Sequence, residues 1–130
     1  MVKKELTAKE FLENMRVWKT EMRELSDELA YWQGFAGSSE DGELAFEIAD
    51  REAYLENQMR TIKGQTLLAA KLIDGIDDPI GRAILRRRYL FGETWAKIGA
   101  ECGGMSARNA RYIHDCTLKI FENLFSEATF

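Results

Sequence analysis

The sequence predicts an all-α protein, and three features favour that fold class. Pro79 is the one proline in a chain of 130 residues, so little interrupts long helices. Good helix formers such as Leu, Met, Ala, Glu, Lys and Arg are common, whereas runs of β-branched residues are few. Apolar residues also recur at steps of three and four over two long stretches, as they do on one face of a helix. We expect a long antiparallel two-helix, coiled-coil-like arm over residues 1–76 and a three-helix module over residues 77–130.

The first helix is expected over about residues 6–33. Thr7 and Glu10 have the spacing of a capping box, which satisfies free backbone N–H groups at a helix start. A helix of this length extends roughly 40 Å, more than a compact domain of this size needs. Behind the capping box, an apolar seam follows at alternating steps of four and three: Phe11, Met15, Trp18, Met22, Leu25, Leu29 and Trp32.

A break in the apolar pattern separates the first helix from the second. Residues 34–42 contain three glycines and two serines and predict a flexible connection. The second helix is expected over about residues 43–74, with an apolar stripe that Glu52 and Thr66 interrupt. Neither helix hides its stripe alone, so the two are expected to fold back on each other. Whether the pair also joins a second chain stays open.

The module begins near residue 77, where the sequence Asp-Asp-Pro ends the second helix. Proline suits the first turn of a helix but cannot continue a preceding one, so Pro79 starts a new helix that Asp78 caps. Gly92 ends this helix, which carries three consecutive arginines, and a short helix follows from Thr94.

The last two helices are expected to meet at a tight turn. Gly103 and Gly104 supply the positive φ that this turn needs, and Gly99 lets the two helices cross closely. Ser106 then begins the final helix, which ends near Phe125. The expected core of the module consists of Ile80, Ile84, Leu85, Leu90, Trp95, Ile98, Cys102, Met105, Ala110, Ile113, Thr117 and Phe121.

The net charge of −4 divides unevenly along the chain. Residues 1–78 carry 10 basic and 17 acidic side chains, whereas residues 79–130 carry 8 basic and 5 acidic ones. The arm is therefore acidic and the module basic. A basic module favours a polyanionic partner such as nucleic acid.

Several other classes of protein are not expected. There is no apolar run of membrane-spanning length and no signal peptide, so we expect a cytoplasmic protein without a membrane partner. Cys102 and Cys116 are expected to face inward as thiols. A single histidine, His114, and the lack of a Cys-x-x-Cys motif argue against zinc. No nucleophile lies beside a base, so we expect neither a cofactor nor an enzymatic activity.

The order of parts from Arg82 to Phe121 is that of a helix-turn-helix. It resembles region 4, the C-terminal DNA-binding region of bacterial sigma factors. With its long helical arm, the chain is similar to the ArpU/RinA-type regulators of phages and integrated elements. The residues that carry the resemblance are Arg82-x-x-Leu85-x-x-Arg88-Tyr89-Leu90-x-Gly92-x-Thr94-Trp95-x-x-Ile98-Gly99 and Ser106-x-x-x-Ala110-Arg111-x-Ile113-His114-x-x-x-Leu118.

The resemblance implies a DNA-binding transcription regulator of phage or mobile-element origin. It also implies that the last helix lies in the major groove, where Arg108, Arg111 and Tyr112 discriminate bases. The chain has no promoter-melting domain, so any sigma-like role is accessory. Ala107 stands where a charged side chain is common, which leaves more of the base recognition to the two arginines. The expected DNA-contacting residues are Arg87, Arg88, Thr94, Lys97, Ser106, Ala107, Arg108, Asn109, Arg111 and Tyr112.

Double-stranded DNA is the expected partner of the module, while the acidic arm either forms a homodimer or touches RNA polymerase. Two alternatives stay open: a helical assembly protein of a phage, and an accessory module that binds RNA polymerase without a DNA site of its own. For the three consecutive arginines, a solvated face with one arginine paired to an acidic residue of the arm competes with phosphate contact. Trp95 and His114 are expected to be structural.

Overall fold

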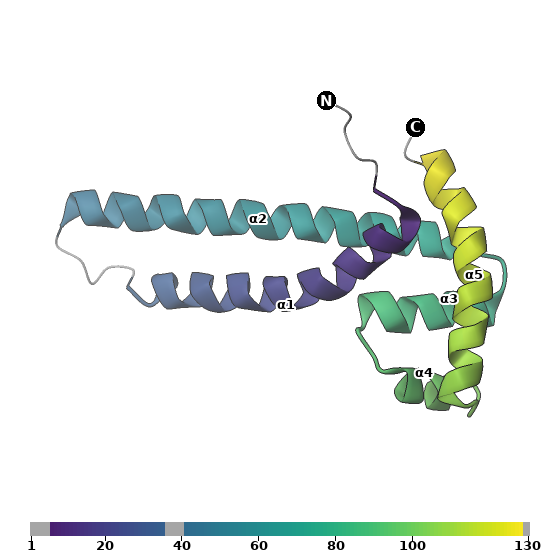
Figure 1. Cartoon of the computed structure of the whole chain (residues 1–130). Helices are drawn as coiled ribbons and strands as arrows, with labels where there is room; N and C mark the ends of the chain where they lie inside the picture. The colour runs from purple at the N-terminus through teal and green to yellow at the C-terminus, as the bar shows by residue number, and fades with distance from the viewer. Residues whose placement is uncertain (1–5, 36–40, 129–130) are drawn as a thin grey trace.

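The structure is a computed structural model that describes residues 6–35 and 41–128. All the regular structure within these ranges is helical and none of it is strand, so the predicted all-α fold class is confirmed. A long antiparallel hairpin of α1 and α2 projects from an end built by the shorter helices and α5 (Figure 1). The elements are α1 (Ala8–Gln33), α2 (Gly42–Asp74), α3 (Pro79–Leu85), the π-helical turn η1 (Arg86–Leu90), α4 (Trp95–Glu101) and α5 (Ala107–Ala128).

Side-chain caps begin the two helices of the hairpin and α3. The Thr7 hydroxyl accepts from the backbone N–H of Glu10 at 3.1 Å, and the Asp41 carboxylate caps α2. Asp78 caps α3, whose first residue is Pro79. These caps satisfy N–H groups that have no partner within their own helix, which is why the helices start there. Part of the flexible connection that we expected over residues 34–42 lies outside the described residues.

A bidentate ion pair joins the two helices toward the free end of the hairpin. Arg51 on α2 donates from Nε and Nη2 to the carboxylate of Glu28 on α1, at 2.7 and 2.9 Å. The Trp32 indole donates to the same carboxylate at 2.8 Å. These bonds, above all those from Arg51, lower the pKa of Glu28 to about 2. Together with the buried Leu55, they hold α2 against α1 far from the module.

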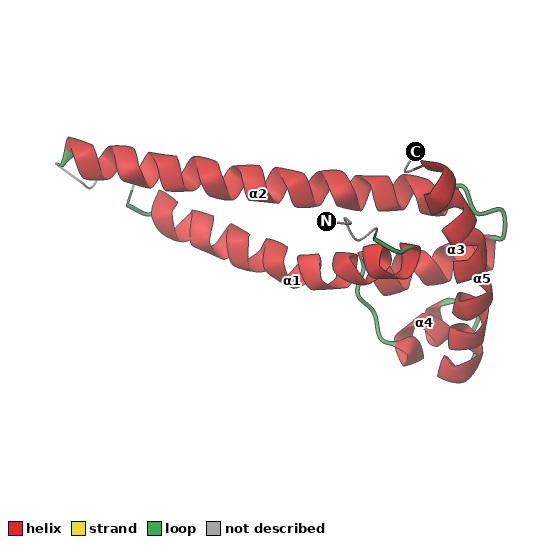
Figure 2. Cartoon of the chain, turned by 45° about the horizontal axis from the view of Figure 1, so that its top comes forward, coloured by secondary structure: helices red, strands yellow, loops and turns green. Residues whose placement is uncertain are grey.

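A shared hydrophobic core joins the start of the hairpin to the module. Phe11 and Met15, which open the apolar seam of α1, pack here against side chains from the module. The start of α1 accordingly lies at the same end of the molecule as α3, α4 and α5 (Figure 2). The buried members of this core are Ala8, Phe11, Leu12, Met15, Ala69, Ile73, Ile76, Leu85, Tyr89, Leu118 and Phe121.

A second, smaller core lies between α3, α4 and α5. A Cβ atom added at Gly99 would lie 2.3 Å from the carbonyl oxygen of Met105, so the close crossing predicted at Gly99 is confirmed. Gly103 and Gly104 have φ angles of 98° and 72°, as the turn requires. The buried members of this core are Ile84, Ile98 and Ala110, with Trp95, Cys102, Met105 and Ile113 packed around them.

Two predictions about burial are wrong. Ile80 is 48% exposed, because α3 approaches α5 through its neighbour Gly81, where an added Cβ would lie 2.6 Å from the Thr117 hydroxyl. Cys116 is exposed, because the buried arc of α5 passes through Ala110, Thr117 and other positions on the opposite side of the helix.

Candidate nucleic-acid interface

The exposed face of α5 carries three side chains suited to DNA recognition. Arg108, Arg111 and Tyr112 lie three and four positions apart, so they share one side of the first turns of α5. Tyr112 is 67% exposed, and both arginines are exposed. Neither arginine has a hydrogen bond or ion pair with another described residue. Ala107 is also exposed and adds a small apolar group at the start of this face.

Other predicted site residues cap the starts of α4 and α5. The Ser106 hydroxyl accepts from the backbone N–H of Asn109 at 3.0 Å, and the Thr94 hydroxyl accepts from that of Lys97 at 3.3 Å. The Asn109 amide lies 3.8 Å from the Met105 sulfur. A hydroxyl that accepts in a cap still has its own O–H to donate. Ser106 and Thr94 can therefore fix the helix starts and also donate to a phosphate oxygen.

The π-helical turn η1 contains the three consecutive arginines. Its π geometry is defined by the backbone hydrogen bond from Phe91 to the carbonyl oxygen of Arg86, at 3.2 Å. Arg86 lies 3.6 Å from the Asp74 carboxylate on α2. One arginine of this turn thus pairs with an acidic residue of the arm, as one of the two alternatives for the three arginines expects.

Arg87 and Lys97 converge on one acidic residue, Glu93. Arg87 donates from one nitrogen to both oxygens of this carboxylate, at 3.2 Å each, and these bonds raise the pKa of Arg87. The Lys97 ammonium lies 3.7 Å from the same carboxylate. Of the predicted DNA-contacting cations, these two are thus partly neutralised within the protein.

Arg88 contacts an aromatic ring and the backbone of the module. Its guanidinium is 4.4 Å from the centre of the Trp95 ring and donates to the backbone carbonyl of Glu93 at 3.1 Å. Burial lowers the pKa of Arg88, and the positive charges of Arg16 and Arg111 lower it further. The sequence gives no sign of Arg16 at this site, because it lies on α1, far from Arg88 along the chain.

His114 is buried beneath the outer face of α5. Its Nδ1 lies 2.9 Å from the Asp115 carboxylate, and its Nε2 lies 2.6 Å from the Tyr89 hydroxyl. An ionised carboxylate only accepts, so Nδ1 carries the proton and Nε2 accepts from Tyr89. Burial is the largest cause of the shift in both pKa values. It lowers the pKa of His114 and raises the pKa of Tyr89 to about 12. His114 is therefore a neutral, hydrogen-bonded structural residue, as predicted.

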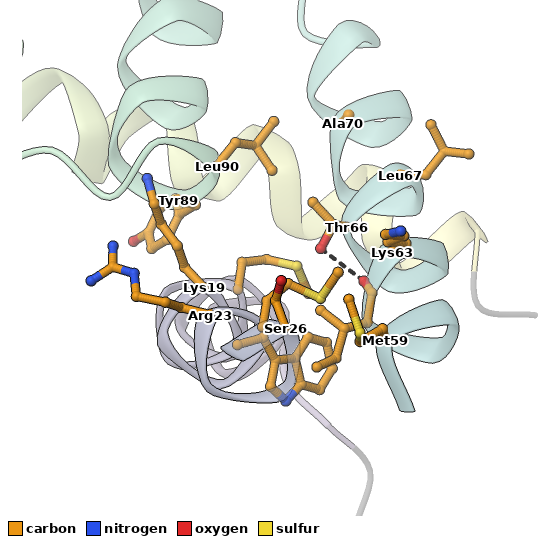
Figure 3. A pocket seen from close by; sticks show the side chains of 14 residues that line it. Lys19, Arg23, Ser26, Met59, Lys63, Thr66, Leu67, Ala70, Tyr89 and Leu90 are labelled. Atoms are coloured by element: carbon orange, nitrogen blue, oxygen red, sulfur yellow. Dashed lines mark hydrogen bonds between the residues drawn. The ribbon is translucent and has the colours of Figure 1, made fainter. Parts of the chain in front are cut away.

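A groove with a volume of about 820 Å³ lies between α1, α2 and η1 (Figure 3). Three cations lie along it, Lys19, Arg23 and Lys63, and none of its lining residues is acidic. The Lys19 ammonium also donates to the carbonyl oxygen of Phe91, which follows η1. The apolar lining consists of Met15, Trp18, Met22, Met59, Ile62, Leu67, Ala70, Tyr89 and Leu90. Although the hairpin is acidic, this groove is basic and apolar.

Comparisons of the chain with protein-family models, with curated proteins and with solved structures give no match. Over residues 6–35 and 41–128, no group of three His, Cys, Asp or Glu side chains could hold a metal ion. None of the helices in these ranges has both the length and the apolar character to cross a membrane.

Proposed function

We propose that this protein is a DNA-binding transcription regulator and that α5 is its recognition helix. The observation that carries the proposal is the exposed face of α5. Arg108, Arg111 and Tyr112 are all exposed there, and neither arginine has a hydrogen bond or ion pair with another residue that the structure describes. Guanidinium groups in this position can make bidentate contacts with the O6 and N7 atoms of guanine. The Tyr112 hydroxyl can donate to a base edge or to a phosphate.

The charges of the module support the same proposal. Residues 79–130 carry 8 basic and 5 acidic side chains. Phosphate contacts supply affinity for any sequence, whereas contacts with base edges discriminate among sequences. Ser106 and Thr94 are suited to phosphate, since each stands at a helix N-terminus with an O–H to donate. Arg87 and Lys97 contribute less, because Glu93 already binds both.

The origin and partners of the regulator rest on the sequence resemblance to sigma region 4 and to ArpU/RinA-type regulators. That resemblance supports a phage or mobile-element regulator located in the cytoplasm. It also supports an arm that either pairs with a second chain or touches RNA polymerase. A phage assembly protein would keep the same DNA-binding face, but would form a ring larger than a dimer. An accessory module for RNA polymerase would lack a DNA site of its own.

Selection of binding sites from random duplex DNA tests the proposal. Replacing Arg108 or Arg111 with Ala should cost about 1 to 3 kcal/mol at the selected site, because a bidentate base contact is lost. Affinity for unrelated DNA should fall much less. Arg60, an exposed arginine of α2, provides the matched control, and Arg60→Ala should bind the selected site like the parent. If no sequence is enriched, or if both α5 variants bind the selected site as tightly as the parent, α5 is not a recognition helix.

A further inference from the structure

One side of the hairpin is basic and apolar next to the module. The groove between α1, α2 and η1 lies on this side, with Lys19 and Arg23 of α1 along one wall and Lys63 of α2 along the other (Figure 3). Along α2, the lining residues Met59, Lys63 and Leu67 follow one another at steps of four. Residues with this spacing share one side of a helix, so the lining shows which side of α2 faces the groove.

Toward the free end of the hairpin, the same side of α2 becomes acidic. Counting back from Met59 by steps of three and four leads to Glu56, Glu52 and Ala49. Glu56 and Ala49 are exposed, and neither glutamate side chain has a hydrogen bond or ion pair with another described residue. Glu52 is also a residue that interrupts the apolar stripe of α2 in the sequence. This side of the hairpin therefore carries cations in one half and carboxylates in the other.

The spacing of the residues on this side of α2 is symmetric. They are separated by three, four, seven, four and three positions: Ala49, Glu52, Glu56, Lys63, Leu67 and Ala70. In a dimer with a two-fold axis, the same surface of both copies takes part and every contact occurs twice. When the axis passes the midpoint of this pattern and the two α2 helices are antiparallel, Glu56 of each copy lies opposite Lys63 of the other. Ala49 of each copy then lies opposite Ala70.

Charge favours this antiparallel arrangement over a parallel one. In a parallel pair, Lys63 would face Lys63 and Glu56 would face Glu56, and like charges placed opposite each other disfavour a contact. In the antiparallel pair, the acidic half of each hairpin covers the basic groove of the other, and Glu52 faces a groove whose far wall carries Arg23. A second copy of the chain thus supplies the carboxylates that the lining of the groove lacks.

We infer that two copies of the chain pair in antiparallel orientation through this side of the hairpin, with the Glu56 carboxylate of each copy bound to the Lys63 ammonium of the other. The inference goes beyond the proposed function and does not depend on it, because the pairing requires no DNA. It names both the partner of the arm and the surface that this partner covers. Because the module lies at one end of the hairpin (Figure 1), the two modules lie at opposite ends of the dimer.

An exchange of charges between two variants tests the contact, with self-association of the full chain measured by sedimentation equilibrium without DNA. Glu56→Lys and Lys63→Glu each place like charges at both copies of the contact, so each should raise the dimer dissociation constant by about 10-fold. Both side chains are exposed, so neither change should unfold the chain. An equimolar mixture of the two variants should regain the association of the parent, because the mixed pair has opposite charges at both contacts.

Glu47→Lys is the matched control. Glu47 is exposed and lies nine positions before Glu56, which is two and a half helical turns, so it is on the opposite side of α2. This variant should dimerise like the parent. A mixture that associates no better than either variant alone overturns the inference, as does a loss in Glu47→Lys equal to that in Glu56→Lys. A parent that is monomeric at micromolar concentration also overturns it, and would leave the groove to a different partner.

Discussion

His114 is a buried polar side chain of α5. Its two ring nitrogens are satisfied by Tyr89 and Asp115, and its ring packs edge-on against Trp95. A proton added at Nε2 would break the bond from the Tyr89 hydroxyl and place a charge in the core. This cost is the reason that burial lowers the pKa of His114.

The folded protein should therefore lose stability in mild acid. The unfolded chain takes up a proton at His114 near its ordinary pKa of 6.5, before the folded chain does. The stability that neutral His114 contributes is present above pH 6.5 and is lost as the pH falls toward the lower pKa of the folded state. Melting temperatures measured from about pH 8 to about pH 5 should show this loss. His114→Gln, which keeps an acceptor for Tyr89 and does not titrate, should lack it; identical profiles for the two proteins would contradict this account.

At the residue scale, the sequence was sufficient for features that depend on neighbours along the chain. The caps at Thr7 and Asp78 and the positive φ of the two glycines after Cys102 were predicted, because each depends on a few adjacent residues. The sequence could not show which arginines form ion pairs or hydrogen bonds within the protein. Arg87 is bound by Glu93 because the chain turns back after η1, whereas Arg108 is exposed and has no hydrogen bond or ion pair with another described residue.

The crossing of α4 and α5 is the element-scale feature on which the proposed recognition helix depends. Gly99 on α4 lies against the backbone just before α5, and the two helices share the smaller core around Ile98 and Ala110. A side chain at Gly99 would have to move backbone atoms of the turn, which are less adaptable than the end of a flexible side chain. The exposed face of α5 depends on this crossing, because the crossing sets the direction of α5.

Gly99→Ala should consequently destabilise the protein and weaken the DNA binding that we propose. The new Cβ would lie 2.3 Å from the Met105 carbonyl oxygen, so α4 and α5 must separate. The expected loss is about 1 to 3 kcal/mol, as for overpacked cores. Gly64→Ala is the control, because Gly64 lies within α2 with open space around it and should gain up to about 1 kcal/mol in helix propensity. Chemical denaturation of both variants measures the two effects. If Gly99→Ala were as stable as the parent, the turn before α5 would have moved to make room for the new Cβ at little cost in free energy.

For the helices, the sequence predicted where each one begins and ends more accurately than which surfaces pack against each other. The helices of the hairpin begin and end within two residues of their expected limits, because capping and apolar spacing are local signals. The π-helical turn at Arg86–Leu90 was not predicted, since nothing in the spacing of its residues distinguishes it from an ordinary helix. The seam of α1 also gave no sign that its start packs on the module while its later part faces α2. Both surfaces are apolar, and the spacing of apolar residues on a helix does not show which surface will pack against them.

The shared core connects the hairpin to α5. Phe11 and Met15 of the hairpin pack in the same core as Leu118 and Phe121 of α5. A partner that moves α1 relative to α2 therefore also bears on α5, because close-packed cores transmit displacement. The groove between α1, α2 and η1 is placed to receive such a partner, since residues of both the hairpin and the module line it.

We expect a second copy of the chain to fill this groove. The hairpin of a second copy has the complementary chemistry, with 17 acidic and 10 basic side chains over residues 1–78 against the cations Lys19, Arg23 and Lys63. We therefore expect a dimer at micromolar concentration that weakens as salt is added.

A substitution at Leu67 tests whether a second copy fills the groove, because Leu67 lines the groove. Leu67 is 56% exposed, so a substitution there should not unfold the chain. Leu67→Glu should raise the dimer dissociation constant by about 10- to 100-fold, the equivalent of roughly 1.5 to 3 kcal/mol of lost leucine burial. Leu68→Glu adds the same charge at the next position, outside the groove lining, and should dimerise like the parent. Sedimentation or light scattering distinguishes these outcomes. A parent that stays monomeric would show that a second copy does not fill the groove. The DNA sites expected of the proposed regulator would then lack paired half-sites.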